Sequence, residues 1–305
     1  MKNTAISINV FRSGGGMESY TFDLVKQMTA QGRAVKVYAA KFDDTLPIYR
    51  HIEPVLINQK KIPKKLRPFF FARQLDSIRR NRSNYATAKS IMAHSEMMRR
   101  ELVELYQVPS EKIRTVYPPA DTGCFFPHPD GIAATRRQYG WRDDETVFLF
   151  PSTGHKRKGL DLLAEFFERT ELPVRLAVAG SPLPRPMKNV QELGFCNNMP
   201  DLYRAADYTV MASLYEPFGL VGIESVLCGT RVVLADNMAC CEVMKPEAGF
   251  FFNRANPQTL ADAVARAVAL KAGGAHRIAS PLQALNYNPT LAHHLAQLDK
   301  MLQAV

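Results

Sequence analysis

The stretch SLYEPFGLVGIES (Ser213–Ser225) joins the end of a strand to the start of a helix through a Pro-Phe-Gly turn. The apolar pattern DYTVMAS (207–213) predicts the strand, and we expect the helix from about Gly219 to Cys228, with Gly229 as its C-cap. A helix that begins at the carboxyl edge of a sheet offers free N–H groups and can bind phosphate or diphosphate. Those N–H groups would belong to Gly219, Leu220 and Val221.

Two glutamates, Glu216 and Glu224, flank this turn. Carboxylates would repel a phosphate if they touched it, so we expect them to accept hydrogen bonds from hydroxyl groups, as a sugar and a ribose would offer. The alternative is that Glu216 is a surface loop residue and Glu224 a solvated helix position. Apolar neighbours of Glu224 on the predicted helix argue against its full solvation.

Length and composition indicate two domains in a reducing compartment. The chain has 305 residues, of which 46% are hydrophobic, enough for two cores. Its five cysteines form an odd set without a C-x-x-C pair, which fits neither a disulfide framework nor a zinc site. The sequence shows neither a signal peptide pattern nor an apolar run of membrane-spanning length. We therefore expect a cytoplasmic protein.

Positive charge is concentrated in one segment. Residues 60–82 carry four Lys and five Arg against one Asp, or +8 of the formal net charge of +10. Three phenylalanines interleave with these cations, as on surfaces that lie on anionic membranes. The alternative is a solvated helix flank whose phenylalanines face a core. No nucleic-acid-binding motif occurs, so we expect no nucleic-acid partner. The candidate contacts to the inner membrane face or to an anionic acceptor are Lys60, Lys61, Lys64, Lys65 and Arg67.

Strands alternate with helices in both halves of the chain, which predicts an α/β fold with two parallel, doubly wound, Rossmann-like sheets. Ligands of such sheets bind outside the carboxyl ends of the strands, where a cleft between two domains would lie. A cluster of prolines between 118 and 129 indicates the linker. We predict an N-terminal domain over 1–121, a C-terminal domain over 122–285, and a final helix over 286–305 that can pack back on the N-terminal domain. Predicted strands are 4–11, 34–40, 51–57, 90–95, 112–119, 146–152, 174–180, 190–195, 207–213, 230–236 and 249–253; predicted helices include 17–30, 96–107, 159–170 and 256–271.

E-P-F-G-L-V-G-I-E closely resembles the E-x7-E motif of the retaining group 1 glycosyltransferases, which have the two-domain GT-B fold. The glycine loop GGGME (14–18), the K-G segment HKRKGLDLL (155–163), the strand RLAVAG and the lead-in MPDLYRAADYTVMAS follow in that family's order. The glycine loop alone is weak evidence for this family, but the motifs together in this order are strong evidence. R-K-G and the paired prolines are similar to the lipopolysaccharide core glucosyltransferase I branch.

The resemblance implies roles for individual residues. Arg157 and Lys158 would neutralise the donor diphosphate, together with the N–H groups of Phe218, Gly219, Leu220 and Val221. Glu216 would hold the transferred sugar and Glu224 the ribose hydroxyls. The remaining donor contacts implied are Gly15 and Gly16, which allow close backbone approach, and Gly180 and Phe195 near the base.

Two departures from the family pattern stand out. The N-terminal domain is shorter than a full doubly wound partner by roughly fifty residues or more. We expect a segment near Arg82–Tyr85 to be absent from this sequence; a gene sequence or purified-protein mass that matches 305 residues would contradict this. In ADNMACCEVM, Ala239-Cys240 replaces the family's glycine pair, so side chains would take the place of close backbone contacts.

The chain lacks a D-x-D motif, so we expect no metal and no other cofactor. The predicted function is metal-independent, retaining transfer of a hexose from a nucleotide sugar, most simply a UDP-hexose, to a membrane-associated glycolipid such as lipopolysaccharide core, or to a polysaccharide. One alternative is a nucleotide-sugar-binding GT-B module without transferase activity. A sugar epimerase fits less well, because those enzymes lack this E-x7-E arrangement.

Overall fold

The structure is a computed structural model that describes residues 4–11, 16–32, 35–42, 53–56 and 85–303. The chain divides into two compact units, Met1–Thr87 and Ala88–Val305. Residues 88–121, which we assigned to the N-terminal domain from the sequence, cluster with the second unit.

The first unit contains one βαβ motif and a further strand: β1 (Thr4–Phe11), α1 (Gly16–Ala30), β2 (Val35–Phe42) and β3 (Glu53–Leu56). The strands are parallel in the order β1-β2-β3, with Thr4 opposite Val35 and Lys36 opposite Glu53. Leu24, Val25 and Met28 of α1 are buried, because residues three and four apart share one face of a helix. The four elements agree with the sequence prediction to within three residues at each end.

The second unit begins with a small parallel pair, β4 (Ile91–Ala93) and β5 (Ile113–Thr115), joined by α3 (Glu96–Tyr106) and a 3-10 turn, Ser110–Lys112. Ser95 caps α3, since its Oγ accepts a hydrogen bond of 3.0 Å from the N–H of Met98. Both strands are shorter than the pattern predicts, because only three residues of each form the ladder.

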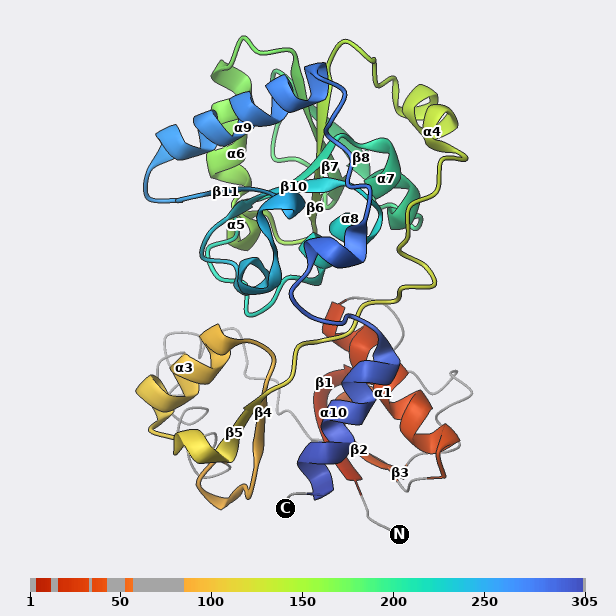
Figure 1. Ribbon diagram of the computed structural model, residues 1–305, viewed down its shortest axis with the longest axis vertical. Coiled ribbons are helices and arrows are strands. Elements are labelled where there is room, and N and C mark those ends of the chain that lie inside the picture. Colours follow the sequence, from red (N-terminus) through yellow and green to blue (C-terminus); the bar gives the residue numbers. More distant parts are fainter. Residues whose placement is uncertain (1–3, 12–15, 33–34, 43–52, 57–84, 304–305) are drawn as a thin grey trace, which may run out of the picture. The chain divides into compact units, whose positions relative to one another are not determined.

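A six-stranded parallel sheet forms the larger part of the second unit (Figure 1). Its strand order is β11-β10-β9-β6-β7-β8. From β6 the chain first adds β7 and β8 on one side of the sheet and then returns to add β9, β10 and β11 on the other side. The carboxyl ends of β6 and β9 therefore form a topological switch point. The strands are β6 (Thr146–Ser152), β7 (Val174–Gly180), β8 (Val190–Gly194), β9 (Tyr208–Met211), β10 (Arg231–Ala235) and β11 (Gly249–Phe252).

Helices cover both faces of this sheet: α6 and α9 lie on one side, α7 and α8 on the other (Figure 1). The central strands β6 and β7 are buried on both faces, so their sequences are largely apolar without alternation. The helices are α4 (Ile132–Tyr139), α5 (His155–Lys158), α6 (Leu160–Arg169), α7 (Met199–Ala205), α8 (Leu220–Leu227), α9 (Pro257–Ala272) and α10 (Leu291–Gln303), with 3-10 turns at Ala239–Val243, Pro246–Ala248 and Pro281–Ala284.

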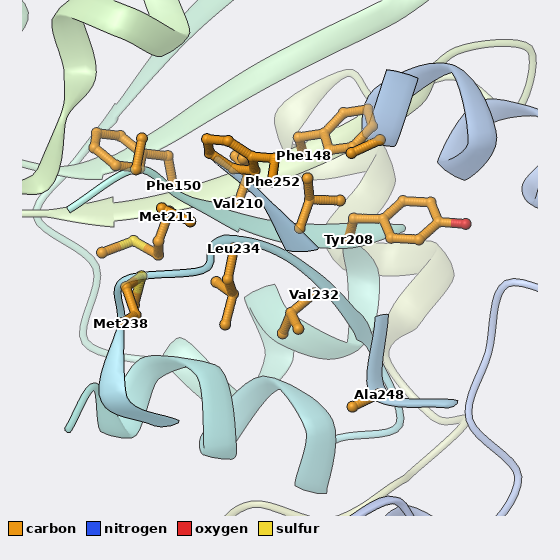
Figure 2. Close-up of a cluster of buried hydrophobic side chains, with 14 of the residues drawn as sticks. Phe148, Phe150, Tyr208, Val210, Met211, Val232, Leu234, Met238, Ala248 and Phe252 are labelled. Atoms are coloured by element: carbon orange, nitrogen blue, oxygen red, sulfur yellow. The ribbon is translucent and has the colours of Figure 1, made fainter. Parts of the chain in front are cut away.

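Aromatic rings fill the centre of the core. Phe148 stacks on Tyr208 with ring centroids 5.4 Å apart and meets Phe167 of α6 edge-on at the same separation. Val232 and Leu234 of β10 point toward α8 on the other side of the sheet (Figure 2). This core holds the carboxyl ends of β6, β9 and β10 at fixed positions relative to α8.

The proline-rich linker lies against the segment that leads into α10. The N–H of Ala120 donates to the Pro289 carbonyl at 2.9 Å, and the Tyr287 hydroxyl donates to the Pro118 carbonyl at 3.2 Å. Arg204 of α7 holds the next part of the linker through the carbonyl groups of Cys124 and Phe126, both at 2.9 Å. The linker is therefore anchored at both ends.

Candidate active site

The turn before α8 presents free N–H groups, as the sequence predicts. Those of Phe218, Gly219, Leu220 and Val221 make no hydrogen bond to the described part of the chain. Carbonyl groups of the same turn are occupied: Ala239 N–H donates to Glu216 O at 3.1 Å, and Cys240 N–H donates to Phe218 O at 2.7 Å. The turn thus offers donors and no competing carbonyl at these two positions, which suits an anion.

Gly219 is required by this turn. Its φ is +98°, and a Cβ there would lie 3.0 Å from the Glu216 side chain and 3.3 Å from Cys240 Sγ. Any other residue would push Glu216 aside or distort the first turn of α8.

Glu216 forms ion pairs with both cations of the K-G segment. Lys158 Nζ and Arg157 Nη1 bond to the same oxygen, Oε2, with the arginine at 3.2 Å. The Glu216 and Lys158 side chains are 11% and 14% exposed, whereas that of Arg157 is 53% exposed. Removing Glu216 would leave the shielded Lys158 charge without this partner. Because Arg157 is much more exposed than Lys158, it is the cation that an incoming ligand reaches most directly.

Backbone hydrogen bonds align α5 with the end of β9. Ala212 N–H donates to Lys158 O at 3.3 Å, and Leu214 N–H donates to Arg157 O at 2.9 Å. Gly159 ends α5 with φ +83°, and a Cβ there would lie 1.9 Å from the Ala212 carbonyl oxygen. The close approach of these two backbones places both cations beside Glu216.

Glu224 lies one turn into α8, partly exposed, and accepts a hydrogen bond of 2.9 Å from the buried Tyr203 hydroxyl. Burial of the carboxyl group raises the pKa of Glu224 to about 6, although the Tyr203 hydrogen bond and the charge of Lys158 act in the opposite direction. The expectation that Glu224 is not fully solvated is confirmed.

The carboxyl end of β7 closes this edge of the sheet. Gly180 has φ +137°, and a Cβ there would lie 2.1 Å from the Ser152 carbonyl oxygen at the end of β6. Phe195, after β8, is 78% exposed. Gly180 therefore lies at the edge that carries the cations, and Phe195 presents a free aromatic surface beyond β8.

The remaining predicted contacts lie either outside the described residues or in the first unit. Gly15 and the basic residues Lys60, Lys61, Lys64, Lys65 and Arg67 lie outside the described residues. Gly16 begins α1 in the first unit. Their proposed roles stay predictions.

Ala239 and Cys240 do not line the site with their side chains, contrary to our expectation. They are 4% and 0% exposed, and Cys240 Sγ packs under Gly219 and Gly222 of the α8 start. The reason is that their N–H groups bind the Glu216 and Phe218 carbonyls, which turns both side chains inward.

Three residues have structural roles that the sequence did not predict. Asn237 donates to the Ser213 and Leu214 carbonyls at 3.1 and 3.0 Å, Tyr203 holds Glu224, and His155 joins β6 to β7. The His155 ring accepts from Ser152 Oγ at 2.9 Å and donates through Nε2 to Ser181 O at 3.0 Å. Tyr203 and His155 stand inside family motifs, but each acts on a distant segment, which spacing does not reveal.

Neither a metal-binding cluster nor a membrane-spanning helix occurs within residues 4–11, 16–32, 35–42, 53–56 and 85–303. No group of three or more His, Cys, Asp or Glu side chains there could hold a metal ion. None of the helices in these ranges is long and apolar enough to cross a membrane.

Comparison with known proteins agrees with this geometry. The family described as "Glycosyl transferases group 1" matches residues 132–279, which include both glutamates and both cations. A "Probable transglycosylase" of Burkholderia thailandensis is 35% identical over 347 positions, covering 96% of this chain and 94% of that protein. The chain belongs to the group 1 glycosyltransferase family.

Solved structures of this group 1 glycosyltransferase fold show the GT-B architecture. The Anabaena HepE structure "in complex with UDP-glucose" has a TM-score of 0.73 at 18% identity, over 99% of this chain and 100% of that one. WaaG, "a glycosyltransferase involved in lipopolysaccharide biosynthesis", has a TM-score of 0.68 at 14% identity, over 88% and 91%. Our assignment of an α/β, GT-B glycosyltransferase is confirmed.

The Burkholderia alignment also bears on chain length. It spans 347 positions but only 96% of a 305-residue chain, so on the order of fifty positions of the relative have no counterpart here. This number is close to the shortfall that we infer for the N-terminal domain. Our expectation of an absent segment near Arg82–Tyr85 stays a prediction, because the comparison does not locate those positions.

Proposed function

We propose that this group 1 glycosyltransferase transfers a hexose from a UDP-sugar with retention of configuration, without a metal ion. The observation that carries the proposal is the convergence of Arg157, Lys158 and the free N–H groups of the α8 start at one sheet edge. The UDP-glucose complex of a protein with this fold favours a uridine nucleotide.

In the proposed reaction, the diphosphate takes Arg157 and Lys158 as partners in place of the Glu216 carboxylate. Glu216 then accepts hydrogen bonds from the sugar hydroxyls, and Glu224 accepts them from the ribose. The bond between the anomeric carbon and the diphosphate oxygen breaks, the acceptor hydroxyl oxygen bonds to that carbon from the same face, and the hydroxyl proton passes to the departing diphosphate oxygen. Negative charge grows on the departing diphosphate, where fixed cations and N–H dipoles stabilise it most.

The proposed acceptor is a glycolipid of the kind found in lipopolysaccharide core, or a polysaccharide, reached at the inner face of the cytoplasmic membrane. The support is the concentration of basic charge in residues 60–82 together with the likeness to WaaG. The enzyme would then be cytoplasmic and peripheral to the membrane.

The experiment has two stages. A thermal-shift screen of UDP-, GDP- and ADP-sugars first identifies the donor, because a bound ligand stabilises the folded state by mass action. Hydrolysis of that donor, which needs no acceptor, is then compared among the unmutated enzyme, Lys158→Ala, Glu216→Ala and Lys156→Ala. Lys156 lies in the same short helix but is exposed, so it serves as the matched control.

We expect kcat/KM to fall about 100- to 1,000-fold for Lys158→Ala and Glu216→Ala, and to stay within about threefold for Lys156→Ala. Tight nucleotide binding without turnover in the unmutated chain would overturn the transferase proposal in favour of a binding module. An equal loss of kcat/KM in all three variants would contradict the proposed roles of Lys158 and Glu216.

A further inference from the structure

Tyr203 is the only described residue that hydrogen-bonds to the Glu224 carboxylate. Its hydroxyl donates to Oε2 at 2.9 Å, and among the described residues no partner binds Oε1. Oε1 is not fully buried, so a ligand can reach it. The carboxylate thus has one fixed oxygen and one free oxygen.

The Tyr203 ring cannot follow a moving carboxylate. It is 1% exposed on α7 and packs edge-on against Phe125 of the linker, with centroids 6.0 Å apart. The backbone carbonyl of Tyr203 accepts a hydrogen bond of 2.6 Å from Thr230 Oγ1. The next residue, Arg204, is bound to two linker carbonyls. The phenol is therefore held in place by α7, by the linker and by Thr230, which immediately precedes β10.

A buried phenol hydroxyl needs an acceptor, but a carbonyl would satisfy that need. Tyr208 shows this ordinary solution in the same domain: it is fully buried, and its hydroxyl donates to the Ala267 carbonyl at 2.8 Å. Tyr203 donates instead to an ionisable side chain that is partly exposed at the proposed donor site. Tyr203 therefore differs from a purely structural core tyrosine in the group that accepts its hydrogen bond, which is a carboxylate and not a backbone carbonyl.

We propose that Tyr203 is a positioning residue, which holds Glu224 ionised and in one rotamer so that its free oxygen can accept hydrogen bonds from the nucleotide ribose. The inference rests on the proposed function for the identity of the ligand. Loss of the hydroxyl removes a hydrogen bond to the charged form and therefore raises the Glu224 pKa.

The first test needs no ligand. Glutamate labelled with 13C at the carboxyl carbon reports each titration by NMR, and the signal lost in Glu224→Gln identifies Glu224. We expect it to titrate near pH 6 in the unmutated enzyme, and about one pH unit or more higher in Tyr203→Phe. Tyr208→Phe, the matched loss of a buried hydroxyl, should leave the titration unchanged. An unmoved signal in Tyr203→Phe, or an equal shift in Tyr208→Phe, would overturn the proposal.

The second test compares UDP with 2′-deoxy-UDP by calorimetry from pH 5.5 to 8.5. The unmutated enzyme and Tyr208→Phe should prefer UDP, and Tyr203→Phe should lose about threefold or more in UDP affinity near pH 6.5 and recover as pH rises. A shifted Glu224 titration with an unchanged UDP preference and pH profile would refute the ribose role of the Tyr203 contact. If no variant binds either nucleotide, the proposed donor is wrong, and the NMR titration alone decides whether Tyr203 controls Glu224.

Discussion

Gly159 allows the backbone at the end of α5 to approach the backbone that follows β9. Gly159 lets the backbone after Lys158 pass the Ala212 carbonyl, where a Cβ would also lie 2.6 Å from Arg254 Nη1. Both backbones are fixed by the Ala212–Lys158 and Leu214–Arg157 hydrogen bonds. A side chain at this position would therefore move the cations away from Glu216.

We predict that Gly159→Ala lowers the free energy of unfolding by about 3 kcal/mol or more, because backbone displacement adds to the cost of a left-handed φ. It should also weaken nucleotide binding, since Lys158 precedes it. Gly140→Ala is the matched control, since Gly140 has φ +67° and no other atom lies within 4 Å of the place that its methyl group would take. Its expected cost is about 1 kcal/mol, with binding unchanged. Urea denaturation measures both costs, and equal values would contradict the close-approach argument.

At the scale of elements, α10 is attached to the linker by a buried histidine. His294 is 2% exposed, and its Nδ1–H donates to the Tyr117 carbonyl at 2.8 Å. Burial lowers the pKa of His294 to about 4, outweighing the hydrogen bond to Tyr117, which raises it. The pKa of His276, in the charge cluster around Asp207, is lowered to about 4 as well, first by burial and then by Arg277.

We predict that stability falls as pH drops from about 6.5 toward 4. In that window the unfolded chain binds protons at these histidines and the folded protein does not, so acid favours unfolding. His294→Asn should reduce the slope of unfolding free energy against pH without abolishing it, because His276 still contributes. His128→Asn, at an exposed histidine with Asp130 nearby, is the control, and a change of slope equal to that in His294→Asn would contradict the assignment. Identical slopes in His294→Asn and the unmutated enzyme would refute the assignment to His294.

On the scale of the whole molecule, charge is distributed unevenly. The segment 60–82 holds +8 of a net +10, so the rest of the chain is nearly neutral. A basic segment of this kind adds about 1 kcal/mol of attraction to an anionic membrane for each basic residue near the surface. This distribution, and not the net charge alone, is what favours a membrane-facing acceptor.

We predict stronger binding to vesicles containing anionic lipid than to neutral vesicles, with the difference lost when Lys60, Lys61, Lys64 and Lys65 are all changed to Glu. The matched control changes four exposed lysines elsewhere, Lys26, Lys89, Lys188 and Lys300, for the same change in net charge. Vesicle co-sedimentation at low and high salt measures the effect, which should weaken as salt rises. Equal loss in both quadruple variants would show that net charge, and not this segment, drives binding.

The sequence predicted most elements of the second unit because their signals are local. β6 and β7 have the predicted bounds, and α9 begins after its Asn256 cap as expected. α4, α5 and α7 were not predicted: each is short, and α5 consists of four polar residues with no apolar face to reveal it. The motif order also indicated the residues of the site.

By itself, the sequence determined the alternation of strands and helices, the glycine before α8 and the identity of the charged residues, because periodicity and backbone freedom depend on near neighbours. Only the tertiary structure decided that Lys158 shares one oxygen of Glu216 across 58 residues and that Tyr203 holds Glu224 across 21. These contacts depend on β9 pairing beside β6 and on α7 packing against α8. Such pairings arise from the burial of whole faces, which no short stretch of sequence specifies.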